Sequence, residues 1–515
     1  MAAPELSAQE QAAMVRELHR RLAAGAPVQL IETHVSYLLV GAERAWKFKK
    51  AIAPGFLDYT TLARRRHCCA EELRLNRRLA PDLYLGLAEV SGSAAAPALD
   101  GTGPVIDCAV TMRAFDQDGL WDRLAARGEL DAARIDELVQ QVARLHADAA
   151  VAPAAGALGT PAAVRAPMLD NLRTLQDLVA AADAPLLQRL ATWEARAWTT
   201  LEPLFAQRLR DGRVRECHGD LHLGNVTLVE GRTTVFDGIE FNDEFRWIDV
   251  ASEIAFMAMD LRSHGLPALA ARFVNGCLQA SGDYGAAAVL RYYLVHRALV
   301  RSKVAALRAR QSGADGAAEG AAQHHYLALA LEISAPPPPT LFITHGFSGS
   351  GKTTATQSLL EATAAIRIRA DVERKRLAGL AELARSGSSL EGGIYAAGMT
   401  AATYARLCEG ARPVLAGGFS AILDATFLQR GARDAARALA FEAGVPCRVL
   451  DFEIPAPLLR ERLRARRGDA SEADEAVLEW QLAHDQPLQD DERAGAIDAV
   501  AAQAAGWDPS MWSRV

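Results

Sequence analysis

The chain has 515 residues, half of them hydrophobic, and its net charge is −7. This composition is typical of a soluble globular protein with two or three domains, and the negative charge argues against a nucleic-acid partner. Seven scattered cysteines without a C-x-x-C pair argue against disulfides or a zinc site, and no apolar run is long enough to cross a membrane, so we expect a cytoplasmic protein.

The first element predicted is an amphipathic helix over residues 7–24, with Ser7 as its N-cap and Glu10 three residues later. The residues before it contain an acid and no apolar core, so we expect no signal peptide. A β-hairpin follows, with strands over residues 35–40 and 45–50 joined by a short turn.

The second strand of this hairpin resembles the V-A-I-K strand that supplies the phosphate-binding lysine of kinases. Alternation places Lys47 and Lys49 on the same face, so either could serve. We prefer Lys47, because Ala45, two residues earlier, matches the small residue before the kinase lysine. Two solvated surface lysines are the alternative. No G-x-G-x-x-G precedes the strand, so a lid over the phosphates would be built differently from that of protein kinases.

A strong helix pattern over residues 61–80 and an apolar strand over residues 105–115 follow. Glu71 and Glu72 lie on the helix, and one of them, Glu72 in our assignment, would pair with the strand lysine as the corresponding glutamate does in kinases. An exposed acidic pair is the alternative. The strand leads to a hinge at residues 112–115, where an adenine would sit.

The most informative stretch of this half reads His218-Gly-Asp-Leu-His-Leu-Gly-Asn225, followed a dozen residues later by Asp237-Gly. The pattern H-x-D-L-x-x-x-N with a later D-G is the polar skeleton of a kinase catalytic loop. Phosphoryl transfer needs positioning, a carboxylate that orients the acceptor, and oxygen ligands for magnesium. Asp220 would take the acceptor's proton, while Asn225 and Asp237 would hold Mg²⁺. A loop of ordinary polar turn residues is the alternative.

Helices dominate residues 120–210, and His146 on one of them is interpreted as a packing residue. Arg246 and Asp249 would brace the catalytic loop from behind. The stretch over residues 311–321 is rich in glycine and alanine, and we expect a loose connection there. Four consecutive prolines make residues 334–340 a stiff linker, because proline continues neither a helix nor a central strand. A new domain is predicted beyond them.

That domain begins with a buried strand pattern at residues 340–344, followed by G-x-x-x-x-G-K-T and a helix over residues 354–365. In this context the backbone N–H groups of the loop surround the β- and γ-phosphates, and the helix N-terminus adds a favourable dipole. Lys352 would neutralise phosphate charge, and the Thr353 hydroxyl would bind Mg²⁺. The predicted nucleotide-binding residues of this loop are Gly346, Ser348, Gly349, Ser350, Gly351, Lys352, Thr353 and Thr354.

Two acidic residues follow at the ends of predicted strands. A pattern over residues 366–371 ends in Asp371, and an apolar strand over residues 421–424 ends in Asp424, the general form of a Walker B strand. Asp424 would hold the magnesium, and Asp371 would orient an acceptor hydroxyl. Capping of the following helix by Asp371 is the alternative.

Further along, Arg460, Arg464 and Arg467 share one face of a predicted helix, just before a loop over residues 468–474. Arginines at this place would form a lid that clamps the transferring phosphate, and Arg464 is our candidate for binding the nucleotide. A solvated basic face is the alternative.

With these motifs, residues 1–333 resemble the aminoglycoside phosphotransferase-like family, which shares the protein-kinase fold, in a bacterial branch where that domain is fused to a P-loop kinase-like domain. Residues 341–515 are similar to small-molecule and polynucleotide kinases of shikimate- or gluconate-kinase-like architecture, through the P-loop, Asp371 with Arg374, and Asp424. The resemblance implies an α/β and α+β multidomain chain. Its first half would be a bilobal protein-kinase-like fold and its second a P-loop NTPase fold with a parallel sheet.

Together these patterns predict a bifunctional kinase in which each half has its own site for ATP and Mg²⁺ and phosphorylates a hydroxyl group of a small molecule. One alternative is an ATP-binding regulatory protein in which one half senses nucleotide. Another is a polynucleotide 5′-kinase in the C-terminal half. The expected partners are ATP and small-molecule acceptors, without a membrane, and neither acceptor nor oligomeric state is defined by the sequence.

Overall fold

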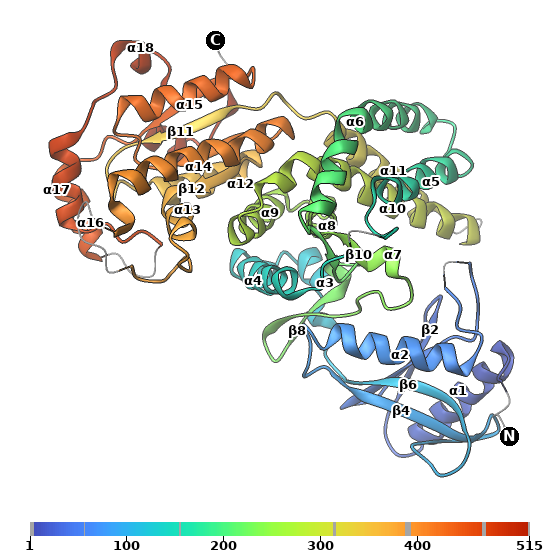
Figure 1. Cartoon of the computed structure of the whole chain (residues 1–515). Coiled ribbons are helices and arrows are strands. Elements are labelled where there is room, and N and C mark those ends of the chain that lie inside the picture. Colours follow the sequence, from blue (N-terminus) through green and yellow to red (C-terminus); the bar gives the residue numbers. More distant parts are fainter. Residues whose placement is uncertain are drawn as a thin grey trace. The chain divides into compact units, whose positions relative to one another are not determined.

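The computed structural model describes residues 5–55, 57–153, 156–312, 316–386, 393–465 and 470–512 (Figure 1). The chain forms two compact units. The first contains Met1–Arg165 and Ala206–Met257, and the second contains Ala166–Phe205 and Ala258–Val515. Helices that precede the proline-rich stretch therefore share a unit with the P-loop. Within the described residues, we find no helix whose length and apolar character would allow it to span a membrane.

The first unit is built around a six-stranded sheet. Its strands are β1 (Gln29–Glu32), β2 (Ser36–Val40), β3 (Arg44–Lys49), β4 (Tyr84–Ser93), β5 (Ala96–Leu99) and β6 (Val105–Arg113). They lie in the order β1-β2-β3-β6-β4-β5, and all neighbours are antiparallel. The predicted hairpin is present as β2 and β3, in which Ser36 lies opposite Lys49 and Val40 opposite Ala45.

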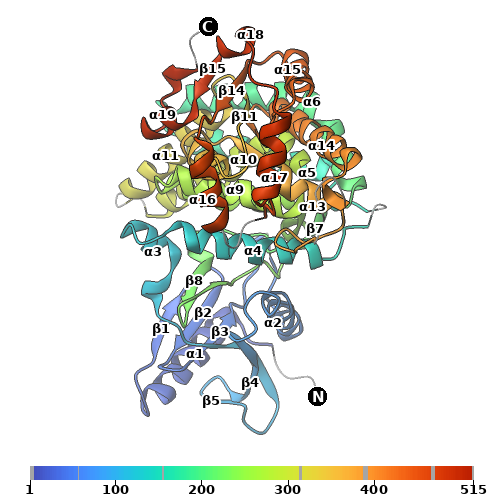
Figure 2. The same ribbon diagram turned by 90° about the vertical axis from the view of Figure 1, so that its left-hand side faces the viewer.

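Two helices cover opposite faces of this sheet (Figure 2). They are α1 (Ala8–Ala23) and α2 (Leu62–Asn76). Helix α1 packs Met14 against Phe48, whereas α2 packs Cys69 against Ala45, because successive side chains of β3 point to opposite faces. Lys47 and Lys49 share the face of Ala45, so they point toward α2.

The catalytic-loop stretch lies between short strands in the rest of this unit. The other elements are α3 (Trp121–Ala126), α4 (Ala132–Asp148), β7 (Val214–Glu216) paired with β10 (Trp247–Asp249), β8 (Val226–Val229) paired with β9 (Arg232–Val235), and α7 (Asp243–Arg246). The stretch connects β7 to β8, and Asp237 follows β9. The borders between the units fall within α5 (Pro161–Gln176), α6 (Ala184–Arg210) and α8 (Val250–Ser263).

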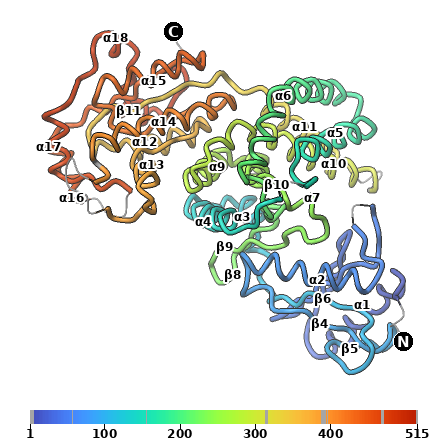
Figure 3. The backbone as a smooth tube through the Cα atoms, viewed as in Figure 1, coloured from blue at the N-terminus to red at the C-terminus, as the bar shows by residue number. Residues whose placement is uncertain are grey.

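The second unit contains a five-stranded parallel sheet. Its strands are β11 (Leu341–His345), β12 (Ile366–Arg369), β13 (Ala421–Asp424), β14 (Cys447–Asp451) and β15 (Ala496–Asp498), in the order β12-β13-β11-β14-β15. The P-loop follows the central strand β11 and leads into α12 (Lys352–Thr363), and the path through α12 to α13 (Ala370–Leu377) can be traced in Figure 3. The carboxyl ends of β11, β12 and β13 thus meet at one edge, where parallel sheets bind their ligands.

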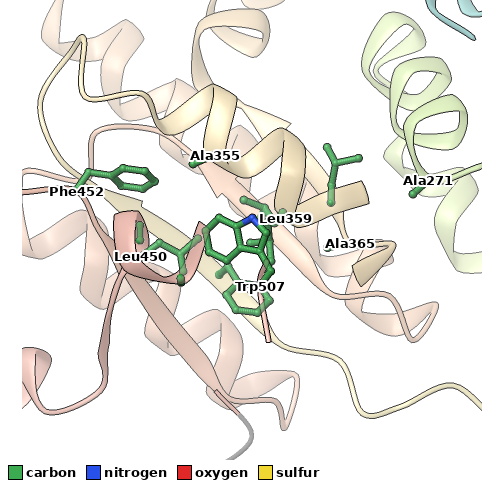
Figure 4. Packing of buried hydrophobic residues seen from close by; sticks show 12 residues of the cluster. Ala271, Ala355, Leu359, Ala365, Leu450, Phe452 and Trp507 are labelled. Atoms are coloured by element: carbon green, nitrogen blue, oxygen red, sulfur yellow. The ribbon is translucent and has the colours of Figure 1, made fainter. Parts of the chain in front are cut away.

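The second unit also contains further helices from both sides of the prolines. They are α9 (Pro267–Ser281), α10 (Ala287–Ser312), α11 (Ala317–Ser334), α14 (Ala397–Ala416), α15 (Arg430–Glu442), α16 (Ala456–Ala465), α17 (Glu475–His484), α18 (Asp490–Arg493) and α19 (Ala499–Ala504). One core cluster joins Leu359, Leu450 and Trp507 to Ala271 of α9, which lies at its edge in Figure 4.

Two local predictions differ from the structure. The strand predicted over residues 366–371 ends at Arg369, and Asp371 lies in the first turn of α13, with Arg369 at the N-cap. Asp371 therefore does not cap this helix. A loose connection is predicted over residues 311–321, whereas α10 extends to Ser312 and α11 begins at Ala317, because alanine favours helix.

Candidate active sites

In the first unit, two lysines of β3 reach one buried glutamate of α2. Lys47 Nζ donates to Glu72 Oε1 at 2.9 Å, and Lys49 contacts Glu72 Oε2. Burial raises the pKa of Glu72, but the two ammonium groups outweigh it and lower the pKa to about 2. Glu71 instead pairs with Arg74 at 2.8 Å on the helix surface. The structure thus brings both candidate lysines to Glu72 and leaves Glu71 outside.

The two lysines differ in their second partner. Lys47 contacts Asp237, whereas Lys49 contacts Glu240, which also accepts a 2.5 Å hydrogen bond from the Tyr59 hydroxyl. Burial lowers the pKa of Lys47, but the charges of Asp237 and Glu72 together outweigh it, so that the pKa lies above its ordinary value. Lys47 therefore meets the predicted metal-binding residue, and Lys49 lies among buried groups. Sequence reasoning missed Glu240, whose only signal is its place three residues after Asp237.

Asp220 is held by two side chains of its own loop. Asn225 Nδ2 donates to the Asp220 backbone oxygen at 2.9 Å and to Oδ2 at 3.0 Å. His222 Nε2 lies 3.4 Å from the same Oδ2. The Asp220 side chain remains 36% exposed, so an acceptor can reach its carboxylate. The amide oxygen of Asn225 is the atom that would face a metal, because its Nδ2 is used by Asp220.

Glu253 of α8 fixes this loop from behind. Its carboxylate is fully buried and accepts the backbone N–H groups of His218 at 2.7 Å and Gly219 at 2.9 Å. Gly219 has a φ of 88°, and a Cβ there would lie 2.7 Å from the backbone oxygen of Phe245. Potential ligand atoms of His146, Cys217 and Glu253 lie within 4.8 Å of one another. Because both Glu253 oxygens accept backbone N–H groups, we interpret this group as the hydrogen-bonded support of the loop.

Asp237 occupies a left-handed backbone conformation, with a φ of 62°. Its N–H donates to the Tyr84 hydroxyl at 3.1 Å, and the N–H of Gly238 donates to Asn76 Oδ1 at 2.8 Å. The His218 ring lies 2.8 Å from the backbone oxygen of Phe236. These contacts connect the Asp237 turn to the sheet, to α2 and to the catalytic loop. The turn that carries Asp237 is therefore hydrogen-bonded to the loop that carries Asn225, the other predicted metal-binding residue.

The predicted braces Arg246 and Asp249 have structural partners. The Arg246 backbone oxygen accepts the N–H of Cys217 at 2.8 Å, next to the catalytic loop, and its guanidinium pairs with Glu216 at 3.3 Å. Asp249 accepts hydrogen bonds from Arg208 at 2.6 and 2.7 Å. Arg246 therefore supports the start of the loop, whereas Asp249 anchors the end of α6.

In the second unit, the P-loop has the backbone that phosphate binding needs. Gly346, Gly349 and Gly351 have φ values of 146°, 86° and 89°. Lys352 Nζ donates to the backbone oxygens of Gly346 at 2.9 Å and Phe347 at 2.7 Å. The loop thus curls around its own lysine, and α12 starts at that residue.

The predicted magnesium-binding pair of this unit is in contact. Thr353 Oγ1 donates to Asp424 Oδ2 at 3.1 Å, and Thr356 of the same helix donates to that oxygen at 3.3 Å. A hydroxyl and a carboxylate at the edge of the phosphate loop are the oxygen donors that suit Mg²⁺. The donor set therefore fits the metal that the sequence predicts.

A cavity of about 580 Å³ joins the P-loop to the acidic residues. Asp371 and Arg374 line it on the α13 side, and Arg374 Nη1 lies 3.3 Å from Asp371 Oδ1. Most predicted P-loop residues line it too, whereas Gly346 and Ser350 do not. The predicted site residues around the cavity are Ser348, Gly349, Gly351, Lys352, Thr353, Thr354, Asp371 and Asp424.

Of the predicted lid arginines, Arg464 does not reach this cavity. Arg460 and Arg464 pair with Glu479 at 2.7 Å and Glu475 on α17, which lies beside α16 (Figure 2). Arg462, on the other side of α16, lines the cavity and lies 3.4 Å from the Ser350 backbone oxygen. The helical period explains the difference, because positions four apart share a face. Arg467 lies outside the described residues.

The loop is also held by a residue that sequence reasoning missed. Gln481 of α17 accepts the Ser348 N–H at 2.9 Å through Oε1, and its Nε2 donates to Ser348 Oγ at 3.0 Å. Both residues are buried and line the cavity. A glutamine on a helix more than a hundred residues away carries no sequence signal for this contact.

Comparisons with known families match two separate parts of the chain, one for each candidate site. Residues 69–290 match the model of the phosphotransferase enzyme family, and residues 341–488 match that of the AAA domain. The chain thus joins a domain of the phosphotransferase enzyme family to a P-loop kinase-like domain, as the sequence predicts. The chain has the predicted combination of a kinase-like fold and a P-loop fold with a parallel sheet, and the family matches support a kinase-type phosphotransferase.

Relatives span nearly the whole chain. Uncharacterised proteins of Mycobacterium tuberculosis and Mycobacterium bovis are 29% identical over 487 residues, which cover 93% of this chain and 91% of theirs. Among solved structures, a choline/ethanolamine kinase family protein from Mesorhizobium loti covers 62% of this chain and 99% of its own, at 12% identity and a TM-score of 0.38. A sugar kinase from Janibacter covers 34% and 94%, at 23% identity and a TM-score of 0.26.

Proposed function

We propose that the protein is a bifunctional ATP-dependent kinase that phosphorylates hydroxyl groups of small molecules at two separate sites. In the first unit, Lys47, held by Glu72, binds the α- and β-phosphates of ATP. Asn225 and Asp237 hold Mg²⁺, which neutralises phosphate charge when bound. The contacts of Lys47 with Glu72 and Asp237 support this assignment, because they are independent of the sequence motifs.

Asp220 is the acceptor-orienting residue of this unit. It accepts the proton of the acceptor hydroxyl as that oxygen bonds to the γ-phosphorus. The bond between the γ-phosphorus and the bridging oxygen breaks, and ADP leaves with that oxygen. Asn225 and His222 keep the Asp220 carboxylate oriented, and its exposure leaves room for the acceptor.

The observation that carries the proposal for the second unit is the cavity that Lys352, Thr353, Asp424 and Asp371 line together. Lys352 binds phosphate oxygens, Thr353 and Asp424 hold Mg²⁺, and Asp371 accepts the proton of the acceptor hydroxyl. One cavity therefore contains the groups for nucleotide, metal and acceptor.

The size of this cavity favours a small acceptor over a polynucleotide. Its volume of about 580 Å³ lies within the range of ordinary small-molecule sites. A nucleotide sensor would need no acceptor carboxylate, yet both units carry one, in Asp220 and Asp371. We therefore favour catalysis at both sites over a regulatory role for either.

The test is transfer of label from γ-labelled ATP to components of a fractionated metabolite extract. Asp220→Asn should abolish one set of labelled products and Lys352→Ala the other. Lys303→Ala, which removes a lysine paired with Asp170 at 3.1 Å and absent from the cavity wall, is the matched control and should change neither. If neither site variant alters transfer, the proposal is wrong. If only Lys352→Ala does, the first unit is not a kinase.

A further inference from the structure

The cavity-lining helix α13 depends on a buried carboxylate for its position. This helix has only eight residues and no side-chain N-cap, yet it carries Asp371 and Arg374. Its Glu373 is fully buried and accepts hydrogen bonds from the Tyr284 hydroxyl at 3.2 Å and Arg406 Nε at 3.1 Å, and it also contacts Arg376. A buried carboxylate needs such partners, so they determine where the helix lies.

The partners of Glu373 are themselves anchored to the end of α9. Arg376 donates to the backbone oxygen of Gln279, and Arg406 donates to that of Gly282 at 3.0 Å. Gly282 has a φ of 68°, and a Cβ there would lie 2.8 Å from Arg376 Nε. Any other residue would be strained at this φ and would have to displace the Arg376 side chain. The turn after α9 is therefore fitted to α13.

Helix α9 also holds β12, the strand that leads into α13. Strand β12 is at the edge of the parallel sheet, where backbone N–H groups lack a neighbouring strand. Buried Asn275 of α9 accepts the Arg367 N–H of this strand through Oδ1 at 2.7 Å. Ala271, one turn earlier, packs in the cluster of Leu360 and Ala365 beside it (Figure 4).

We propose that Asn275 and Tyr284 are positioning residues for the reaction of the second unit, acting on Asp371 through β12 and α13. Both lie in the part of the chain that matches the phosphotransferase enzyme family, residues 69–290. A segment within the phosphotransferase family match thus positions the acceptor carboxylate, Asp371, of the P-loop kinase. This inference rests on the proposed role of Asp371.

The test compares Tyr284→Phe with Tyr292→Phe in full-length protein carrying Asp220→Asn, so that only the second unit is active. Tyr292 is a matched control, because it is also buried and its hydroxyl also lies 3.2 Å from a buried glutamate, Glu194 of α6. We expect Tyr284→Phe to speed hydrogen exchange in α13. We also expect it to lower kcat of Mg–ATP hydrolysis, with water as acceptor, about fivefold, with KM for ATP within twofold. Tyr292→Phe should change neither quantity.

Asp371→Asn separates this inference from the proposed function. If Asp371→Asn leaves hydrolysis unchanged, the role of Asp371 and everything resting on it are wrong. If Asp371→Asn lowers kcat but Tyr284→Phe matches Tyr292→Phe in exchange and kcat, only the positioning role is overturned. A rise in KM with constant kcat also overturns it. Should Tyr284→Phe fail to fold, Asn275→Ala decides by the same measurements.

Discussion

Replacing Lys49 by methionine should destabilise the first unit more than replacing Lys47, although both lysines share Glu72. The Lys49 side chain is 2% exposed, and its partners Glu72 and Glu240 are 0% and 4% exposed. Lys49→Met leaves these carboxylates buried around an apolar group, which costs about 3–5 kcal/mol. Lys47→Met leaves Glu72 with Lys49, and Asp237 is 41% exposed to water, so we expect about 1–2 kcal/mol.

Calorimetry measures this difference, since the first unit's transition should shift by on the order of 10 °C in Lys49→Met and by less than half of that in Lys47→Met. Phosphotransfer by folded protein at low temperature should show the opposite order, because Lys47 is the residue that meets Asp237. Lys50→Met is the control: Lys50 pairs with Glu32, whose side chain is 61% exposed, and lies over the Tyr37 ring, so the change should cost about 1 kcal/mol or less. Equal shifts, or a larger one for Lys47→Met, would refute the reasoning.

Three further perturbations follow from single contacts. The pKa of Glu72 is about 2 in the folded protein against 4.5 ordinarily, so its contribution is complete above pH 4.5 and lost as the pH falls toward 2. Urea titrations at pH 5 and pH 3 should therefore show about 2 kcal/mol less acid sensitivity in Glu72→Gln than in the parent; equal sensitivity would contradict this. Gly219→Ala should abolish first-unit phosphotransfer, because its Cβ would meet a backbone oxygen at 2.7 Å, whereas Gly231→Ala, with a φ of 78° but open space, should retain it. Gln481→Leu should weaken ADP binding several-fold in titration calorimetry by releasing Ser348; unchanged affinity would show that this contact does not organise the loop.

Local patterns in the sequence predict much of the fold. The β2–β3 hairpin follows from alternation and a turn, and the β11–α12 unit follows from an apolar run and a glycine-rich loop. The helix start at Ser7 follows from its capping box with Glu10, which is present. Sheet order does not follow, because β6 pairs between β3 and β4 through contacts that no local signal encodes.

In the candidate sites, the sequence predicted the residues that belong to recognisable motifs. Asp220 and Asn225 belong to one motif and are in contact. Thr353 and Asp424 meet because Asp424 ends β13, which lies beside the strand that leads into the P-loop. Glu240, Glu253 and Gln481 were not predictable. Each is a single polar residue whose partner lies on another element, and only the folded chain brings the two together.

Contacts of single residues also explain why the second compact unit includes helices that precede the prolines. Residues 1–333 and 341–515 remain the predicted domains, and the prolines do interrupt helix and sheet as expected. Yet Arg291 of α10 donates to the backbone oxygens of Gly417 and Gly418 at 3.2 and 2.9 Å, beyond the linker. Burial lowers its pKa to about 10, still well above neutral, so the guanidinium keeps its charge in this contact. A linker determines where the chain is stiff, whereas buried hydrogen bonds determine which segments fold together, and here they join helices before the prolines to the P-loop sheet.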